Sequence, residues 1–410
     1  MNDHVQKCWN TALALLQPTE AQLQHGLELH RDALVFETYG FAPNACFDGA
    51  ALAAAAEEGA SAVELQDLRE DMSMTRWATV PAEREEFKQA FDFAGVDCIF
   101  QNAGEEGQTA MRLARRLARF TFSTDVMRDF VCRAAFPEDI AAAHAQGRHC
   151  LYFTGNGVPL VEDWITPHDE LRFIRIFFQL GIRMMHLTYN RRNMIGEGCA
   201  ESSNAGLSDF GRMVIAEMNK QGVIVDCAHS GWQTSLEAAQ ASSKPMVASH
   251  SACAALQPHH RCKPDEVIRA ICDTDGMIGI CWVPGFLGGS GTIVEVLNHV
   301  DYVVRNYGAQ YVGLGSDTSY TPQRQAEEWG KVPRVKERKR WNNFWWPNDP
   351  LYDPKFQQPQ QRESLAWTNW PLMSVGMVQR GYSDDDIRRI LGGNMMRVAQ
   401  AAVEGIRPEA

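Results

Sequence analysis

The sequence lacks the features that would place the protein in a membrane or on a nucleic acid. No run of apolar residues approaches the roughly 18 that a membrane-spanning helix needs. The first 22 residues lack the basic region, the long apolar stretch and the cleavage site of a secretory signal. A formal net charge of −12 disfavours nucleic-acid binding, which needs a basic face. We therefore expect a soluble, cytoplasmic protein with no membrane or nucleic-acid partner.

The sequence also lacks paired cysteines and flexible linkers. Its 11 cysteines are scattered without a CxxC pair, which indicates reduced thiols rather than a disulfide framework. No Gly-, Ser- or Pro-rich stretch divides the 410 residues, and 45% of them are hydrophobic, which is ample for a full core. These observations predict one domain over residues 1–410.

Strand-like and helix-like segments alternate along the chain, which is typical of an α/β fold with a parallel sheet. No GxGxxG turn follows any strand-like segment, so we predict a (β/α)8 TIM-like barrel rather than an open sheet. The pattern gives one strand more than eight, and we interpret 96–103 as the surplus. The expected strands are 33–40, 61–68, 96–103, 149–155, 182–190, 223–229, 245–250, 277–283 and 311–317.

Residues 223–251 carry a histidine at the end of each of two expected strands. His229 and His250 flank a helical segment, and a crossover helix between parallel strands places the two strand ends at the same edge of the sheet. In a closed barrel this edge is where active sites lie. The pair is typical of metal ligands, although two buried histidines without a function are the alternative.

The last strand is followed by a long segment of different composition. Residues 318–371 form a polar, tryptophan-rich insertion, and loops of this length are uncommon unless they are functional or disordered. Its tryptophans argue against disorder, so we expect either a lid over the barrel mouth or a subunit contact. Residues 372–410 are expected to form C-terminal helices, with Gly392 and Gly393 separating two of them.

Four motifs in this order and spacing resemble the membrane (renal-type) dipeptidases, a peptidase family among the amidohydrolase-like barrels. They are GLSDFGRMVIAEMNKQGVIVDCAHS, PMVASHSACAALQPHHRC, VGLGSD and GGNMMRV. The resemblance covers residues 33–405. It implies a barrel with a two-zinc centre that hydrolyses dipeptides or similar small amides by metal-ion catalysis, usually as a dimer.

The resemblance implies a degenerate metal site. The family's Asp-x-His-x-Asp corresponds to 37–41, which puts Tyr39 and Phe41 at two ligand positions, and its bridging glutamate corresponds to Asn156. His229 and His250 retain the ligands of the second zinc. Because catalytic zinc needs about three protein ligands, we expect at most one zinc ion, on these histidines with Asp317 as a conceivable third ligand, or a metal-free pocket.

The resemblance also implies substrate-side residues. Asp317 keeps the aspartate that handles the water proton, whereas Tyr189 replaces a histidine that stabilises the oxyanion, with Asn190 beside it. His186 is three residues from Tyr189, and we expect it to face the other side of the strand.

Substrate binding draws on further positions. The family's carboxylate-binding arginine falls at Ala254, and Arg261 is a candidate substitute. We expect Tyr39, Asn156, Asn190, Arg261 and Glu37 to bind substrate, and Asp317, His229, His250 and Tyr189 to be catalytic.

Three hypotheses follow. The first is an enzyme with a remodelled mono-metal or metal-free site that acts on a small amino-acid-like or amide substrate, with lyase or isomerase chemistry included. The second is a zinc-dependent dipeptidase. The third is a non-catalytic binding protein that uses the same barrel.

Overall fold

The structure, a computed structural model, describes residues 2–104, 109–333 and 341–406. Its centre is a parallel sheet in the order β1-β2-β4-β5-β6-β7-β8-β9. The strands are β1 (Phe36–Gly40), β2 (Cys98–Asn102), β4 (His149–Gly155), β5 (Ile182–His186), β6 (Ile224–Asp226), β7 (Val247–Ser251), β8 (Met277–Ile280) and β9 (Val312–Leu314).

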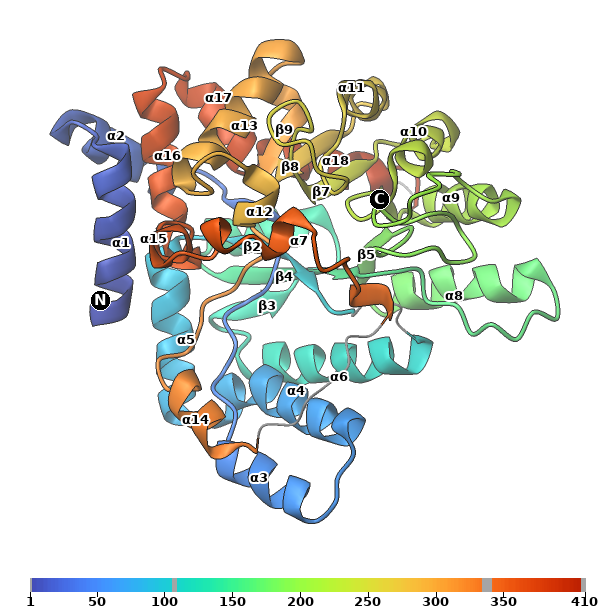
Figure 1. Ribbon diagram of the computed structural model, residues 1–410, viewed down its shortest axis with the longest axis horizontal. Coiled ribbons are helices and arrows are strands. Elements are labelled where there is room, and N and C mark those ends of the chain that lie inside the picture. Colours follow the sequence, from blue (N-terminus) through green and yellow to red (C-terminus); the bar gives the residue numbers. More distant parts are fainter. Residues whose placement is uncertain (1, 105–108, 334–340, 407–410) are drawn as a thin grey trace.

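Two backbone hydrogen bonds join the two ends of this sheet. The amide of Asp317, just after β9, donates to the carbonyl of Tyr39 in β1 at 3.3 Å, and the amide of Phe41 donates to Thr318 O at 3.3 Å. Eight parallel strands therefore form a nearly closed barrel within the described ranges, and helices surround it (Figure 1). The predicted (β/α)8 fold is confirmed.

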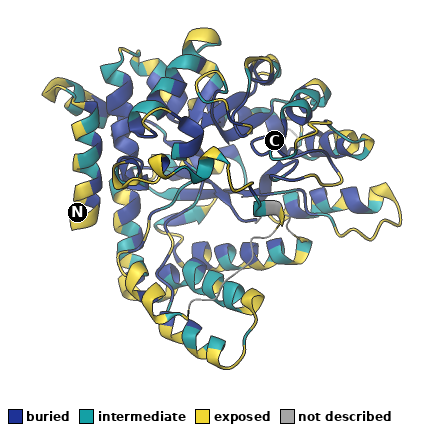
Figure 2. Cartoon of the chain, in the orientation of Figure 1, coloured by how far each residue is buried: buried dark blue, intermediate teal, exposed yellow. Residues whose placement is uncertain are grey.

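The helices lie mainly between successive strands, and their outer faces carry most of the exposed residues (Figure 2). They are α1 (Asp3–Leu16), α2 (Glu20–Asp32), α3 (Gly49–Glu57), α4 (Ala62–Thr79), α5 (Pro81–Ala94), α6 (Ala110–Val126), α7 (Pro137–Ala145), α8 (Pro167–Gln179), α9 (Asp209–Gln221), α10 (Trp232–Ala241), α11 (Asp265–Asp273), α12 (Pro284–Leu287), α13 (Ile293–Asn306), α14 (Gln325–Lys331), α15 (Pro359–Ser364), α16 (Trp370–Gln379), α17 (Asp384–Arg388) and α18 (Asn394–Val403). None of the described helices is long and apolar enough to cross a membrane.

One strand prediction, 61–68, and the choice of 96–103 as the surplus strand were wrong. Residues 61–68 begin α4, because Ser61 and Glu64 form a capping box: Glu64 N donates to Ser61 Oγ at 3.3 Å, and Ser61 N donates to Glu64 Oε2 at 2.8 Å. Residues 96–103 are not a surplus strand, since β2 lies in the barrel between β1 and β4. The additional strand is β3 (Val131–Arg133), which lies between α6 and α7 and pairs with β4.

The C-terminal glycines do not separate two helices as expected. The helix α17 continues through a π-helical turn, Arg389–Gly393, directly into α18. A Cβ on Gly392 would lie 2.3 Å from Leu34 O and 2.8 Å from Phe36 N. Gly392 therefore permits a close approach of this turn to β1 rather than a break.

The interior of the barrel is filled by side chains from successive strands. Phe36, Phe100, Tyr152 and Met184 pack together with Met395 of α18 and with further strand residues. The helix α18 also contacts β1, β6, β8 and β9. It therefore covers the amino-terminal end of the barrel and leaves the carboxyl-terminal end of the strands for a functional site.

Candidate active site at the carboxyl ends of the strands

His229 and His250 meet at the carboxyl-terminal end of the barrel. His250 lies in β7, His229 follows β6 by three residues, and their Nε2 atoms are 3.0 Å apart. His250 is fully buried and His229 is 6% exposed. The strand-helix-strand unit thus brings the two imidazoles together, as parallel pairing requires.

The partners of the two Nδ1 atoms define the tautomers. His229 Nδ1 lies 2.8 Å from the side-chain oxygen of Asn190 and donates to it. His250 Nδ1 donates to Ser249 Oγ at 2.8 Å, because the Ser249 hydroxyl itself donates to Asp226 Oδ2. With a proton on each Nδ1, both Nε2 atoms carry lone pairs. Two lone pairs therefore face each other, an arrangement that a proton or a cation between them would stabilise.

Burial lowers the pKa of both imidazoles well below the usual histidine value, and the positive charge of Arg261 acts in the same direction. Both rings are therefore neutral at neutral pH. A neutral imidazole is the form that binds a metal or accepts a proton.

Two tyrosines flank the histidine pair. The Tyr39 ring stacks on His250 with centroids 3.7 Å apart, and the Tyr189 ring stacks on His229 with centroids 4.0 Å apart. The Tyr39 hydroxyl donates to Asn156 Oδ1 at 2.6 Å. Two residues that the resemblance places at metal-ligand positions are thus bonded to each other.

Asp317 and Glu37 lie at the junction of β9 and β1. Asp317 is half-buried and adopts a left-handed backbone with φ of 56°, which an aspartate tolerates better than most residues. Glu37 is fully buried and accepts hydrogen bonds from Ser316 N at 3.2 Å, from Ser316 Oγ and from Trp367 Nε1 at 2.9 Å. Burial raises the Glu37 pKa to about 8 although these hydrogen bonds oppose it.

Arg261 is the basic group beside the histidines. It is 1% exposed, and its Nη1 donates to the carbonyl of Ala228, the residue before His229. Its Nε and Nη2 have no hydrogen-bond partner among the described residues. Ala254, in contrast, only pairs its backbone amide with Lys263 O. Arg261 therefore has free donors that suit an anionic substrate group.

His186 belongs to the same cluster, so the prediction that it faces away was wrong. Its ring centroid lies 5.3 Å from those of Tyr39 and His250 and 5.4 Å from that of His229. β5 ends at His186, and the strand alternation used to compare it with Tyr189 does not continue beyond that residue. Sequence reasoning also missed Asp226, whose Oδ2 lies 2.6 Å from His186 Nε2. Its position at the end of β6 was the feature that could have identified it.

The residues present do not fit a two-metal centre. Phe41 offers no donor atom, and Tyr39 and Asn156 are hydrogen-bonded to each other. The converging Nε2 atoms of His229 and His250 do fit one cation.

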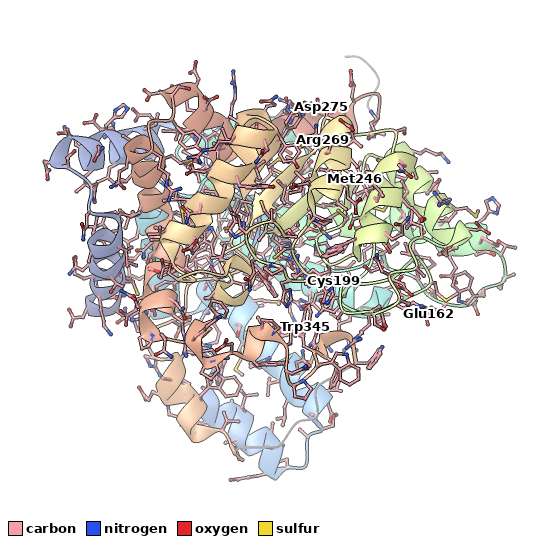
Figure 3. The ribbon with its side chains drawn as sticks, turned by 45° about the horizontal axis from the view of Figure 1, so that its top comes forward. Glu162, Cys199, Met246, Arg269, Asp275 and Trp345 are labelled. Atoms are coloured by element: carbon pink, nitrogen blue, oxygen red, sulfur yellow. The ribbon has the colours of Figure 1, made fainter. Side chains whose placement is uncertain are left out.

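Part of the insertion covers this end of the barrel. Trp345 is 8% exposed and packs on His259 and Phe286, with ring centroids 5.4 Å and 6.2 Å away. His259 Nε2 lies 3.0 Å from Asp349 Oδ1. In Figure 3, Cys199 and Trp345 lie toward one end of the barrel, whereas Met246 and Asp275, which precede β7 and β8, lie toward the other.

Comparison with known proteins identifies the family. A model of the membrane dipeptidases, peptidase family M19, matches residues 28–338. The chain belongs to this family. Its relatives include dipeptidase aclJ of Aspergillus oryzae, 27% identical over 231 residues, and dipeptidase tcpJ of Claviceps purpurea, 28% identical over 230 residues. Each match covers 55% of this chain and 46% of the relative, so it spans about half the length of these proteins.

Several solved structures have a similar fold. An amidohydrolase from Pseudomonas aeruginosa has a TM-score of 0.66 at 21% identity, and the alignment covers 92% of this chain and 98% of the amidohydrolase chain. The probable dipeptidase PvdM from the same organism has a TM-score of 0.65 at 16% identity, with 93% and 98% covered. A metallo peptidase from Rhodobacter sphaeroides, liganded with a phosphinate mimic of L-Ala-D-Ala, has a TM-score of 0.63 at 17% identity, with 90% and 100% covered. These likenesses support the barrel fold.

Proposed function

We propose that this chain is an enzyme of the membrane dipeptidase family that acts on a small amide or amino-acid-like substrate bearing a carboxylate, with a centre for one cation. The 3.0 Å approach of two neutral Nε2 atoms, from His229 and His250, carries this proposal. The bond between Tyr39 and Asn156 supports a single cation rather than two. The cation suited to two imidazole nitrogens is zinc.

The chain's own groups have distinct roles in this proposal. Asp317, at the end of β9, accepts the proton of the attacking water or of the substrate. The free guanidinium donors of Arg261 bind the substrate carboxylate. Asn190 holds the His229 ring through Nδ1, and the Tyr189 hydroxyl takes the place of the histidine that the resemblance gives the oxyanion-stabilising role. A bound cation supplies Lewis-acid polarisation of the substrate carbonyl.

Metal titration and turnover test the proposal together. Chelator-stripped protein is expected to bind one equivalent of zinc, and His229→Ala to lose that binding. The exposed His260→Ala is the matched control and should bind as the parent does. Binding of two equivalents would contradict the single-cation centre.

Turnover is measured against a panel of L,L- and L,D-dipeptides and N-acyl amino acids. Asp317→Asn is expected to retain zinc and lose about 10²-fold or more of any activity found, because a general base contributes roughly that much. Activity confined to dipeptides would identify a dipeptidase of the ordinary kind. Zinc binding without turnover of any member of the panel, or turnover that survives Asp317→Asn, would contradict the proposed enzyme.

A further inference from the structure

The histidine pair is one ligand short of a catalytic zinc site. Zinc in enzymes takes three protein ligands and keeps one position open. His229 and His250 supply two nitrogens. The position that the resemblance gives to a third ligand is Asn156, whose side-chain oxygen accepts from Tyr39. A third donor must come from elsewhere in the chain if a cation is to be held firmly.

His186 lies where a third imidazole would be expected. The ring centroids of His186, His229 and His250 form a nearly equilateral triangle with sides of 5.0, 5.3 and 5.4 Å. Three imidazoles bound to one tetrahedral zinc ion at Zn–N distances of about 2.0–2.1 Å have centroids about 5 Å apart. The triangle therefore has the size that one shared cation requires.

Neither ring nitrogen of His186 makes a hydrogen bond within the described part of the chain. The residue is fully buried. Its Nε2 lies 2.6 Å from Asp226 Oδ2, although the contact lacks hydrogen-bond geometry. Its Nδ1 has no hydrogen-bond partner among the residues that the structure describes. An unpartnered buried nitrogen is costly, so this atom is the one available to a ligand.

Asp226 provides the charge that such a cation needs. It is fully buried, and its Oδ1 accepts from Ala228 N at 2.8 Å and Ser249 N at 3.1 Å. Its Oδ2 lies 2.6 Å from His186 Nε2 and accepts a hydrogen bond from Ser249 Oγ. Donor atoms of His186, Asp226 and His250 all lie within 4.8 Å of one another, and His229 is linked to this group through His250, at 3.0 Å between the two Nε2 atoms. A carboxylate behind a ligating histidine orients the ring and raises its basicity.

We propose that His186 is the third protein ligand of the cation held by His229 and His250, with Asp226 as the carboxylate that orients it. This inference rests on the proposed single-cation centre. It moves the third ligand to the end of β5, a strand from which the resemblance implies no ligand. It also gives the Asp226–Ser249–His250 hydrogen bonds a role, because the same carboxylate then fixes two of the three imidazoles.

X-ray absorption of the zinc-loaded protein counts the imidazoles directly. We expect three imidazole nitrogens in the parent and two in His186→Ala. Cobalt substitution gives a second readout, since four-coordinate Co²⁺ absorbs visible light much more strongly than six-coordinate Co²⁺. The parent is expected to give the intense spectrum, and His186→Ala the weak one.

Zinc affinity measured by chelator competition completes the test. Asp226→Asn is expected to weaken binding by about 10–100-fold, the usual effect of losing a carboxylate behind a ligand, and His186→Ala by more. His299→Ala is a control, because His299 is fully buried but its ring nitrogens pair, among the described residues, with Cys253 N at 3.0 Å and Leu287 O at 3.0 Å, away from the histidine cluster. A circular-dichroism melt of each metal-free variant shows whether it is folded. If His186→Ala does not fold, His186→Asn is used in its place.

The outcomes separate this inference from the function on which it rests. A parent protein that binds no zinc would remove the single-cation centre and this ligand assignment together. One zinc ion with two imidazoles, bound equally well by His186→Ala, would overturn the assignment and leave the single-cation centre intact.

Discussion

The carboxyl group of Glu37 lies fully buried between Ser316 and the Trp367 indole. Because burial favours the protonated form, its pKa in the folded protein is about 8. Its hydrogen-bond partners are Ser316, the residue before Asp317, and Trp367 in the insertion. Glu37, which the sequence placed among substrate-binding residues, thus also joins β1 to both elements.

This pKa predicts how the stability of the folded protein changes with pH. The folded state keeps a proton on Glu37 up to about pH 8, whereas the unfolded chain releases it near pH 4.3. Stability from this group is therefore complete below the unfolded pKa and is lost as pH rises toward the folded pKa. Measured by urea unfolding, the free energy of unfolding of the parent should fall between pH 5 and pH 8.5. The fall in Glu37→Gln should be smaller, by a few kcal/mol at most. Parallel profiles for the two proteins would contradict the raised pKa.

At the scale of elements, the turn Arg389–Gly393 fixes how the C-terminal helices meet the barrel. Gly392 and Gly393 are adjacent and both helical, yet a Cβ on Gly392 would clash with the backbone of β1 whereas the nearest atom to one on Gly393 is 3.4 Å away. Close packing thus requires glycine at position 392, whereas position 393 has room for a side chain.

This contrast gives a matched pair of substitutions. Gly392→Ala should destabilise the protein by about 1–3 kcal/mol, because a methyl group must be fitted against backbone that cannot move aside. Gly393→Ala should be neutral or stabilising by up to about 1 kcal/mol, since alanine is the better helix former. Denaturant unfolding of both variants measures the difference. Equal destabilisation would show that helix geometry, rather than contact with β1, governs this turn.

At the scale of the whole molecule, the insertion connects parts of the chain that are far apart in sequence. Trp367 donates to Glu37 in β1, Trp345 packs on His259, and Asp349 bonds to His259. Trp346, beside Trp345, is 58% exposed. These contacts favour the lid alternative for this part of the insertion, and the exposed tryptophan keeps the subunit contact as a separate prediction.

Hydrogen exchange distinguishes the two tryptophans. Trp345→Ala should accelerate exchange across residues 341–356 and leave the barrel strands protected, because it removes the anchor to His259 and Phe286. Trp346→Ala should leave exchange in this segment unchanged if the protein is monomeric. Faster exchange with Trp346→Ala, together with a change in mass by light scattering, would indicate the subunit contact instead.

Local sequence signals account for the ends of some elements. Ser208 caps α9 and the left-handed Gly222 ends it, and both signals act within one turn. The capping box at Ser61 and Glu64 is equally local, so the sequence carried the correct signal for a helix where a strand was predicted at 61–68. The short strand β3 gave no comparable signal, since its three residues are stabilised by pairing with β4.

The sequence by itself determined the alternation of strands and helices, and with it the placement of His229 and His250 at one edge of a parallel sheet, because strand direction and crossover connections leave few alternatives. Only the tertiary structure decided that His186 and Asp226 join this pair, that Tyr39 bonds Asn156, and that the Glu37 carboxyl is buried. Those contacts join strands many residues apart and depend on where each strand ends and how the barrel closes, which no local pattern of residues encodes.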